Sequence, residues 1–180
     1  PLIYDFYGFP ESYYQLSYPA PGAPQLASRI SELLLHAGVA FGERPDRGWD
    51  HGVWIPMLGL YPEADVPLLQ ISLPSQDANE LMQLGALLAQ LREEGVLIIS
   101  SGLLTHNLRQ WTPDGVVAPW ARAFDAWLAE RLLARDWAAL CEWPSAPGAR
   151  ESVPTADHLV PLFVAIGASR TGDAVSFPVM

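Results

Sequence analysis

Residues 66–101, VPLLQISLPSQDANELMQLGALLAQLREEGVLIISS, decide the fold that the sequence predicts. Two nearly continuous apolar runs, 66–73 and 96–101, flank an amphipathic stretch, 77–94, which Gly95 ends. Continuous apolar runs are typical of strands covered on both faces, and leucines three and four residues apart are typical of a helix. A strand, a helix and a second strand in this order predict a right-handed crossover between parallel strands.

This crossover unit predicts an α/β fold, which we expect to be a single-domain sandwich with a central mixed or mostly parallel sheet flanked by helices. The chain has 180 residues, half of them apolar, which suits one domain with a sizeable core. Ligands of such sheets bind beyond the carboxyl ends of the strands. The loop that follows the second strand, with His106 in it, is therefore a candidate for the functional site.

The sequence outside the crossover unit predicts helices joined by loops. The first 23 residues are rich in Tyr, Pro and Gly, which indicates a loop with aromatic anchors. Pro24 then opens a helix that Gly38 ends, with His36 in its last turn, where an imidazolium is favourable. The other expected elements are a loop at 39–54, helices at 55–60, 119–134 and 136–143, a loop at 144–153, a last helix starting at 154–158 with Thr155 as its N-cap, and a strand at 174–179.

Charge and cysteine content exclude several classes of protein. The formal net charge is −10, so the chain repels nucleic-acid phosphates and anionic membranes, and we expect neither as a partner. No apolar run is long enough to span a membrane, and no signal peptide is visible. The single cysteine, Cys141, cannot form an internal disulfide; we interpret it as a buried small residue in a cytoplasmic protein.

Three of the four histidines, His51, His106 and His158, lie in loops or at the ends of expected elements. Imidazole is the commonest metal ligand and the side chain best suited to proton transfer near neutral pH. Their spacing matches no local metal-binding motif, so it leaves open whether they are ligands, catalysts or solvated side chains. The sequence also lacks the Gly-x-Ser-x-Gly turn of serine hydrolases, a Cys-x-x-Cys pair and a Gly-rich phosphate loop.

Six segments, in unbroken order along nearly the whole chain, resemble the class III extradiol ring-cleavage dioxygenases, in particular their DOPA 4,5-dioxygenase-like branch. Each segment alone is a weak signal, but the set in this order is specific. The segments are DFYGFP at 5–10, YPAPG at 18–22, DHGVW at 50–54, YPEADVP at 61–67, SGLLTHNL at 101–108 and PTADHLVPL at 154–162.

The resemblance implies an enzyme that depends on a non-haem metal and uses O₂ to open the ring of a catechol-type, DOPA-like substrate. His158 resembles a metal ligand of the family. His106 resembles the active-site histidine that handles the proton and dioxygen chemistry, close enough to the metal to count as a ligand as well. His51 resembles the pocket histidine that hydrogen-bonds the substrate hydroxyl. Fe(II) is the implied metal for activity, and Zn(II) can occupy such a site.

The expected site also includes carboxylates that orient the histidines, and metal ligands from outside these 180 residues. Carboxylates such as Asp50 and Asp157 are candidates for orienting the ring nitrogens. The family places two more metal-binding histidines upstream of the position of Pro1, and a short segment after Met180. Residues 1–180 are therefore expected to form one dioxygenase-like domain without its N-terminal strands and that terminal segment.

Two alternatives remain open at the level of the sequence. One is a zinc-dependent hydrolase on the same fold, since a zinc-activated water needs three protein ligands and an open position. The other is a non-catalytic member of the superfamily that acts by binding. The sequence does not identify the catechol, the bond that is cleaved or the native metal, and a homo-oligomer is compatible with it.

Overall fold

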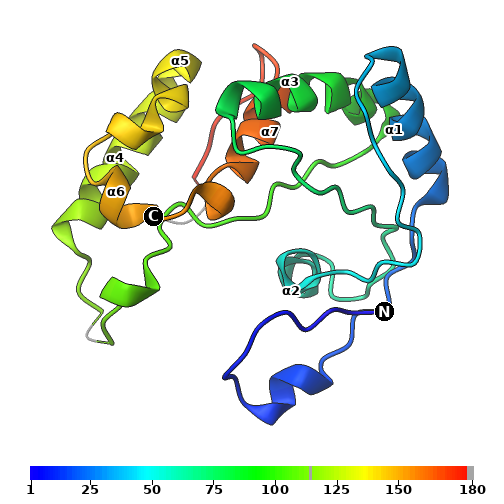
Figure 1. The fold of residues 1–180 in the computed structure, drawn as a ribbon, viewed down its shortest axis with the longest axis horizontal. Helices are drawn as coiled ribbons and strands as arrows, with labels where there is room; N and C mark the ends of the chain where they lie inside the picture. Colours follow the sequence, from blue (N-terminus) through cyan, green and yellow to red (C-terminus); the bar gives the residue numbers. More distant parts are fainter. Residues whose placement is uncertain (114, 178–180) are drawn as a thin grey trace. The chain divides into compact units, whose positions relative to one another are not determined.

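The computed structural model describes residues 1–113 and 115–177. The chain forms two compact units, Pro1–Ser72 and Leu73–Met180, and each is considered by itself. Figure 1 shows that their regular structure is helical. The first unit contains η1 (Glu11–Gln15), α1 (Pro24–His36) and α2 (His51–Leu60). The second contains α3 (Ala78–Leu88), η2 (Ala89–Glu94), η3 (Leu108–Gln110), α4 (Pro119–Ala134), α5 (Trp137–Cys141), η4 (Trp143–Ser145), α6 (Ala149–Ser152), η5 (Ala156–His158) and α7 (Pro161–Ala168).

The predicted central sheet is wrong. Within residues 1–113 and 115–177, strand pairing is limited to two isolated bridges, Leu2 with Trp49 and Gly22 with Leu68. The predicted strand at 174–179 is not seen either, because residues 174–177 have no regular structure, and 178–179 lie outside the described residues. The α/β sandwich is therefore replaced by helices connected by irregular chain.

Both apolar runs that predicted the sheet lack the hydrogen bonds of a strand. In the run 66–73, backbone bonding is confined to Leu68, whose N–H donates to Pro21 O at 2.9 Å and whose O accepts from Ala23 N at 3.0 Å. In the run 96–101, the side chains of Leu97 and Ile99 are 65% and 42% exposed. An apolar run indicates a tendency to be buried, but a strand also needs a neighbouring backbone to bond with, and that partner cannot be read from the run itself.

Helix boundaries marked by Pro and Gly are confirmed. α1 begins at Pro24, and α4 has the bounds that were predicted. The amphipathic stretch 77–94 forms α3 followed by η2, with the Asp77 carboxylate accepting the Glu80 N–H at the helix N-terminus. Gly95 ends it at a φ of 81°, a left-handed conformation that glycine adopts without steric cost.

Other boundaries differ from the prediction. α2 begins at His51, four residues before the predicted helix, so His51 is a helical residue and not a loop residue. The predicted loop 144–153 contains η4 and α6. The last predicted helix is two, η5 after Thr155 and α7 from Pro161, because proline favours the first turn of a new helix over the interior of an existing one.

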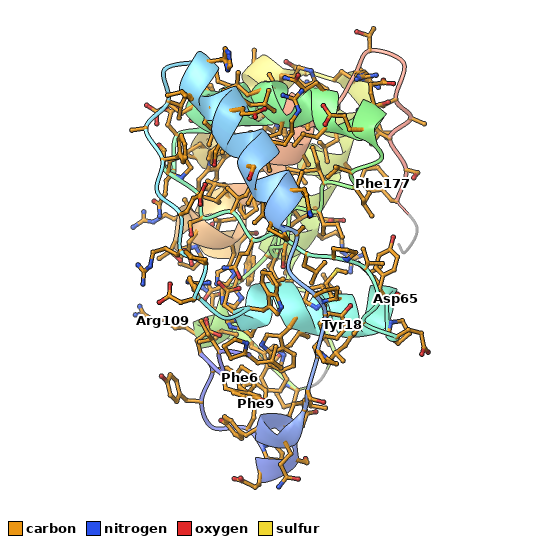
Figure 2. All side chains as sticks on the ribbon, turned by 90° about the vertical axis from the view of Figure 1, so that its right-hand side faces the viewer. Phe6, Phe9, Tyr18, Asp65, Arg109 and Phe177 are labelled. Atoms are coloured by element: carbon orange, nitrogen blue, oxygen red, sulfur yellow. The ribbon has the colours of Figure 1, made fainter. Side chains whose placement is uncertain are left out.

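The core of the first unit is aromatic. Trp54 of α2 is fully buried, and its indole Nε1 donates to Ile3 O at 3.2 Å. Tyr18 is also buried and donates from its hydroxyl to Tyr61 O at 2.8 Å. Burial and the nearby negative charge of Asp65 raise the pKa of Tyr18, so its hydroxyl stays protonated and keeps this bond. Figure 2 labels Tyr18 and Asp65 in this unit.

In the second unit, α3 and α7 pack against each other at backbone distance (Figure 1). A Cβ added at Gly85 of α3 would lie 2.1 Å from Val164 O, and one at Gly167 of α7 would lie 2.0 Å from Met82 O. Only glycine fits at both places, because a real Cβ never approaches an oxygen so closely. The buried side chains of these two helices include Leu81, Leu84, Leu88, Phe163, Val164 and Ile166.

An ion-pair network anchors the chain after α7. The Arg92 guanidinium of η2 donates to the Asp173 carboxylate at 2.6 Å, and the Arg170 N–H donates to the same oxygen at 2.8 Å. The hydrogen bond from Arg92, followed by that from Arg170, lowers the pKa of Asp173 to about 2. The segment after α7 is thereby tied to η2.

Within the part of the chain that the structure describes, no helix combines the length and apolarity needed to cross a membrane.

Gly85→Ala tests the contact between α3 and α7. The added methyl group has no space against the α7 backbone, so we expect a loss of about 1–3 kcal/mol in the free energy of unfolding. Urea denaturation followed by circular dichroism measures it. Gly172→Ala is the matched control, because a Cβ there meets no atom within 4 Å. Equal stability of the two variants would show that the helices do not approach this closely.

Candidate active site

The structure brings together two of the histidines that the sequence singled out. The ring centroids of His106 and His158 lie 3.8 Å apart, and the ring planes are inclined by 43°. Both side chains are only partly buried, that of His158 being 33% exposed. Two imidazoles at this separation can present nitrogen donors to one small ion or one bound molecule.

Backbone hydrogen bonds hold this pair in place. The Leu103 N–H donates to His158 O at 2.9 Å, and the His106 N–H donates to Ser152 O at 2.8 Å. Gly102 makes the contact feasible, because a Cβ at that position would lie 2.2 Å from His158 O. The loop that carries His106 is therefore joined at several points to the segment that leads into α7, and the motif SGLLTHNL needs its glycine for packing.

The surroundings of the pair disfavour positive charge on His106. Partial burial lowers the pKa of His106, the adjacent His158 lowers it further, and the charge of Asp157 opposes both effects. A hydrogen bond from the Thr155 hydroxyl lowers the pKa of Asp157 despite partial burial, so Asp157 is a carboxylate at neutral pH. Its Oδ2 lies 3.4 Å from His158 Nε2, beyond ordinary hydrogen-bond length, so it acts on the pair through its charge.

The pair fits part of a metal shell. Imidazole nitrogens suit iron and zinc alike, and a mononuclear catalytic site takes about three protein ligands. Over residues 1–113 and 115–177, no group of three or more His, Cys, Asp or Glu side chains is arranged to hold a metal ion. His106 and His158 thus bring two imidazoles together, fewer than the ligands that such a shell takes.

His51 lies in the first unit, where it is the first residue of α2. Its Nδ1 is 2.7 Å from Asp5 Oδ1, and its backbone N–H donates to the same oxygen at 3.0 Å. The Phe6 ring stands edge-on to the imidazole, with centroids 5.8 Å apart. Partial burial raises the pKa of Asp5, but the hydrogen bonds from His51 outweigh this, so its pKa lies below the usual value.

The carboxylate beside His51 is not the one that the sequence indicated. Asp50 was a candidate for orienting a ring nitrogen, but its carboxylate instead binds Arg47 at 3.1 Å and the side-chain amide of Gln70. Asp5 takes that place from 46 residues away along the chain. The sequence marked residues 5–10 as a family motif, but no local spacing connects residue 5 with residue 51.

The fourth histidine, His36, and the single cysteine, Cys141, have surroundings that suit a structural role. His36 ends α1 with its Nδ1 2.7 Å from Glu32 O, as expected for a histidine that satisfies a helix end. Cys141 is only partly buried, not fully as predicted, and its Sγ lies 3.5 Å from Asn79 Oδ1. Burial, followed by the charges of Asp77 and Glu142, raises the pKa of the Cys141 thiol, which argues against a nucleophilic role.

Comparison with known proteins confirms the family resemblance. Residues 1–176 match the family described as the catalytic LigB subunit of aromatic ring-opening dioxygenase. The chain belongs to this family.

Individual relatives lie in the same branch. The chain is 45% identical over 172 residues to the 4,5-DOPA dioxygenase extradiol of Beta vulgaris, covering 93% of this chain and 64% of that protein. It is 36% identical to the 4,5-DOPA dioxygenase extradiol of Escherichia coli K12, covering 99% and 68%. A crystal structure of the uncharacterized protein JW3007 from Escherichia coli K12 matches with a TM-score of 0.80 at 35% identity, covering 92% and 70%. The chain thus spans about two thirds of the length of these relatives.

Gly102→Ala tests whether this glycine brings the two imidazoles together. The methyl group would overlap His158 O, so we expect the Leu103–His158 bond to break and stability to fall by about 1–3 kcal/mol. The ring signals of both His106 and His158 should shift in the NMR spectrum. Ser101→Ala, at the exposed neighbouring position, is the control. Unchanged ring signals in Gly102→Ala would show that Gly102 does not determine how the two imidazoles are placed.

Proposed function

We propose that the full protein is an extradiol ring-cleavage dioxygenase, an oxidoreductase that opens a catechol-type, DOPA-like ring with O₂. The observation that carries this proposal is the pairing of His106 with His158, each within a segment typical of the family. The relatives named 4,5-DOPA dioxygenase extradiol support the substrate class. Because the chain spans about two thirds of their length, the reaction is proposed for the whole protein.

The proposed cofactor is Fe(II), with Zn(II) able to occupy the same site. His158 would hold it as a ligand, with His106 beside it and near enough to count as one, and the remaining ligands are proposed to come from the part of the full protein that lies beyond these 180 residues. A bound Fe(II) supplies a Lewis acid that favours the deprotonated diol and offers an open position for O₂.

The protein residues have distinct proposed roles. His158 serves as a metal ligand. His106 accepts a proton from a catechol hydroxyl at a ring nitrogen, aided by surroundings that leave the imidazole uncharged. His51 hydrogen-bonds a substrate hydroxyl from the N-terminus of α2. The proposed compartment is the cytoplasm, in keeping with the single unpaired cysteine. Since the family match covers 1–176, both units are proposed to belong to one dioxygenase domain.

Turnover of a catechol tests the proposed reaction. Full-length protein loaded anaerobically with Fe(II) and then mixed with DOPA or a simpler catechol in air should form a yellow semialdehyde, with one O₂ consumed per ring opened. The Zn(II)-loaded protein is the matched control and should form none. Iron-bound protein that opens no catechol would contradict the proposal, and a zinc-dependent hydrolysis that needs no O₂ would favour a hydrolase instead.

Single replacements test the three histidine roles. His158→Ala should lower metal affinity, because it removes a ligand. His106→Ala and His51→Ala should keep most of the bound metal, but lower kcat by roughly 10²- to 10⁴-fold, the usual contribution of a proton-transferring group. Metal content by mass spectrometry and initial rates measure the two effects. His36→Ala, at the exposed end of α1, is the control. Equal loss of metal in the three site variants would contradict these roles.

A further inference from the structure

Asp5 offers one oxygen to two donors of the same residue. Its Oδ1 lies 2.7 Å from the Nδ1 of His51 and 3.0 Å from the backbone nitrogen of His51. A carboxylate accepts hydrogen bonds and donates none, so the Nδ1 of His51 must carry the proton in this contact. The other ring nitrogen, Nε2, is left without that proton when the imidazole is neutral.

The same contact caps α2. Asp50 occupies the N-cap position of the helix, but its side chain makes no capping bond. The free N–H of His51, the first residue of α2, is instead bound by Asp5. A negative charge at a helix N-terminus is favourable, and the low pKa of Asp5 shows that these bonds outweigh the cost of its partial burial.

The backbone around Asp5 gives it little freedom. The segment before it lies along residues 48–49, with the Ile3 N–H donating to Trp49 O at 2.7 Å and the Trp49 N–H donating to Pro1 O at 3.0 Å. The indole of buried Trp54 binds Ile3 O, and a Cβ at Gly48 would lie 2.4 Å from Pro1 O. Three hydrogen bonds and one close approach therefore fix the chain at Pro1 and Ile3, just before Asp5.

Aromatic side chains lie beside the His51 ring. Phe6 lies edge-on to the His51 ring and also contacts Tyr14 and Phe9, with centroids at 5.2 and 5.4 Å. Figure 2 labels Phe6 and Phe9 close together in the N-terminal loop. Phe6, a hydrocarbon side chain, brings no carbonyl or carboxylate that could compete with Asp5 for the imidazole N–H. The His51 side chain nevertheless keeps 42% of its surface exposed. The exposed part of the ring is the one that can meet another molecule.

We propose that Asp5 is a positioning residue, which fixes the His51 ring with its proton on Nδ1 and so directs Nε2 toward proton exchange with a substrate hydroxyl. The proton of the hydroxyl passes to Nε2, the oxygen keeps the electron pair, and the resulting imidazolium still donates from Nδ1 to Asp5. No electron changes hands in this step. The proposal rests on the proposed dioxygenase function for the identity of the hydroxyl, and on the dyad geometry alone for the state of the ring.

Nitrogen-15 NMR of the histidine rings tests the state of the ring. The full-length protein is used in its Zn(II)-loaded, diamagnetic form. His51 should show the Nδ1-protonated form in the unaltered protein, and Asp5→Ala should shift it toward the Nε2-protonated form that a free histidine side chain prefers in water. Glu11→Gln, an exposed carboxylate of the same unit, is the control and should leave His51 unchanged. A His51 ring that keeps its form in Asp5→Ala would overturn the proposal.

Turnover separates positioning from capping. Asp5→Ala removes the cap of α2, so it should lower the urea concentration at which half of the protein is unfolded. Asp5→Asn keeps an oxygen for the two N–H groups but removes the charge, so it should restore that midpoint. Its kcat in the Fe(II)-loaded protein should nevertheless stay roughly 10- to 100-fold low, with a much smaller change in KM, as for carboxylates that orient imidazoles elsewhere. Normal kcat in Asp5→Ala despite an altered ring would overturn the proposal. If the unaltered protein opens no catechol, the proposed function fails, while the NMR result still decides the role of Asp5.

Discussion

The second unit depends on the backbone contact between α3 and α7. Glycines at positions 85 and 167 let each helix reach the other's main chain, and the leucines of α3 and Phe163 of α7 are buried beside it. From α3 the chain continues through η2 to the loop with His106, and His158 lies three residues before α7 begins. The helix pair thus fixes both segments from which the two imidazoles project, and the Gly102 contact sets the final distance between them.

Sequence reasoning predicted what local chemistry determines. α1 and α4 start at prolines, and the left-handed Gly95 ends η2, because these residues act on the backbone whatever surrounds them. The prediction of a sheet was wrong because strand formation depends on contacts that are distant in the sequence. A strand is defined by its neighbour, and neither Leu68, with one isolated bridge, nor the exposed Leu97 has the ladder that the apolar pattern suggested.

The candidate site was predicted in its residue types, but not in its supporting contacts. The motifs pointed to His106 and His158, and the structure places these rings side by side. Asp50 was among the carboxylates expected to orient a ring nitrogen of the site histidines. A helix that begins at His51 puts the side chain of residue 50 at its N-cap position, turned toward Arg47 and Gln70, and leaves the first helical N–H to an acceptor from elsewhere. Tertiary structure alone supplies Asp5.

His51 and His106 have different surroundings, although the sequence gives both only as loop histidines. His51 lies against the Asp5 carboxylate, which accepts from Nδ1 and so keeps the ring proton on that nitrogen. His106 lies against another imidazole and is partly buried, which favours a ring that stays neutral. Since the two environments are built from different contacts, one from a side-chain carboxylate and one from backbone bonds and a neighbouring ring, each can change without the other.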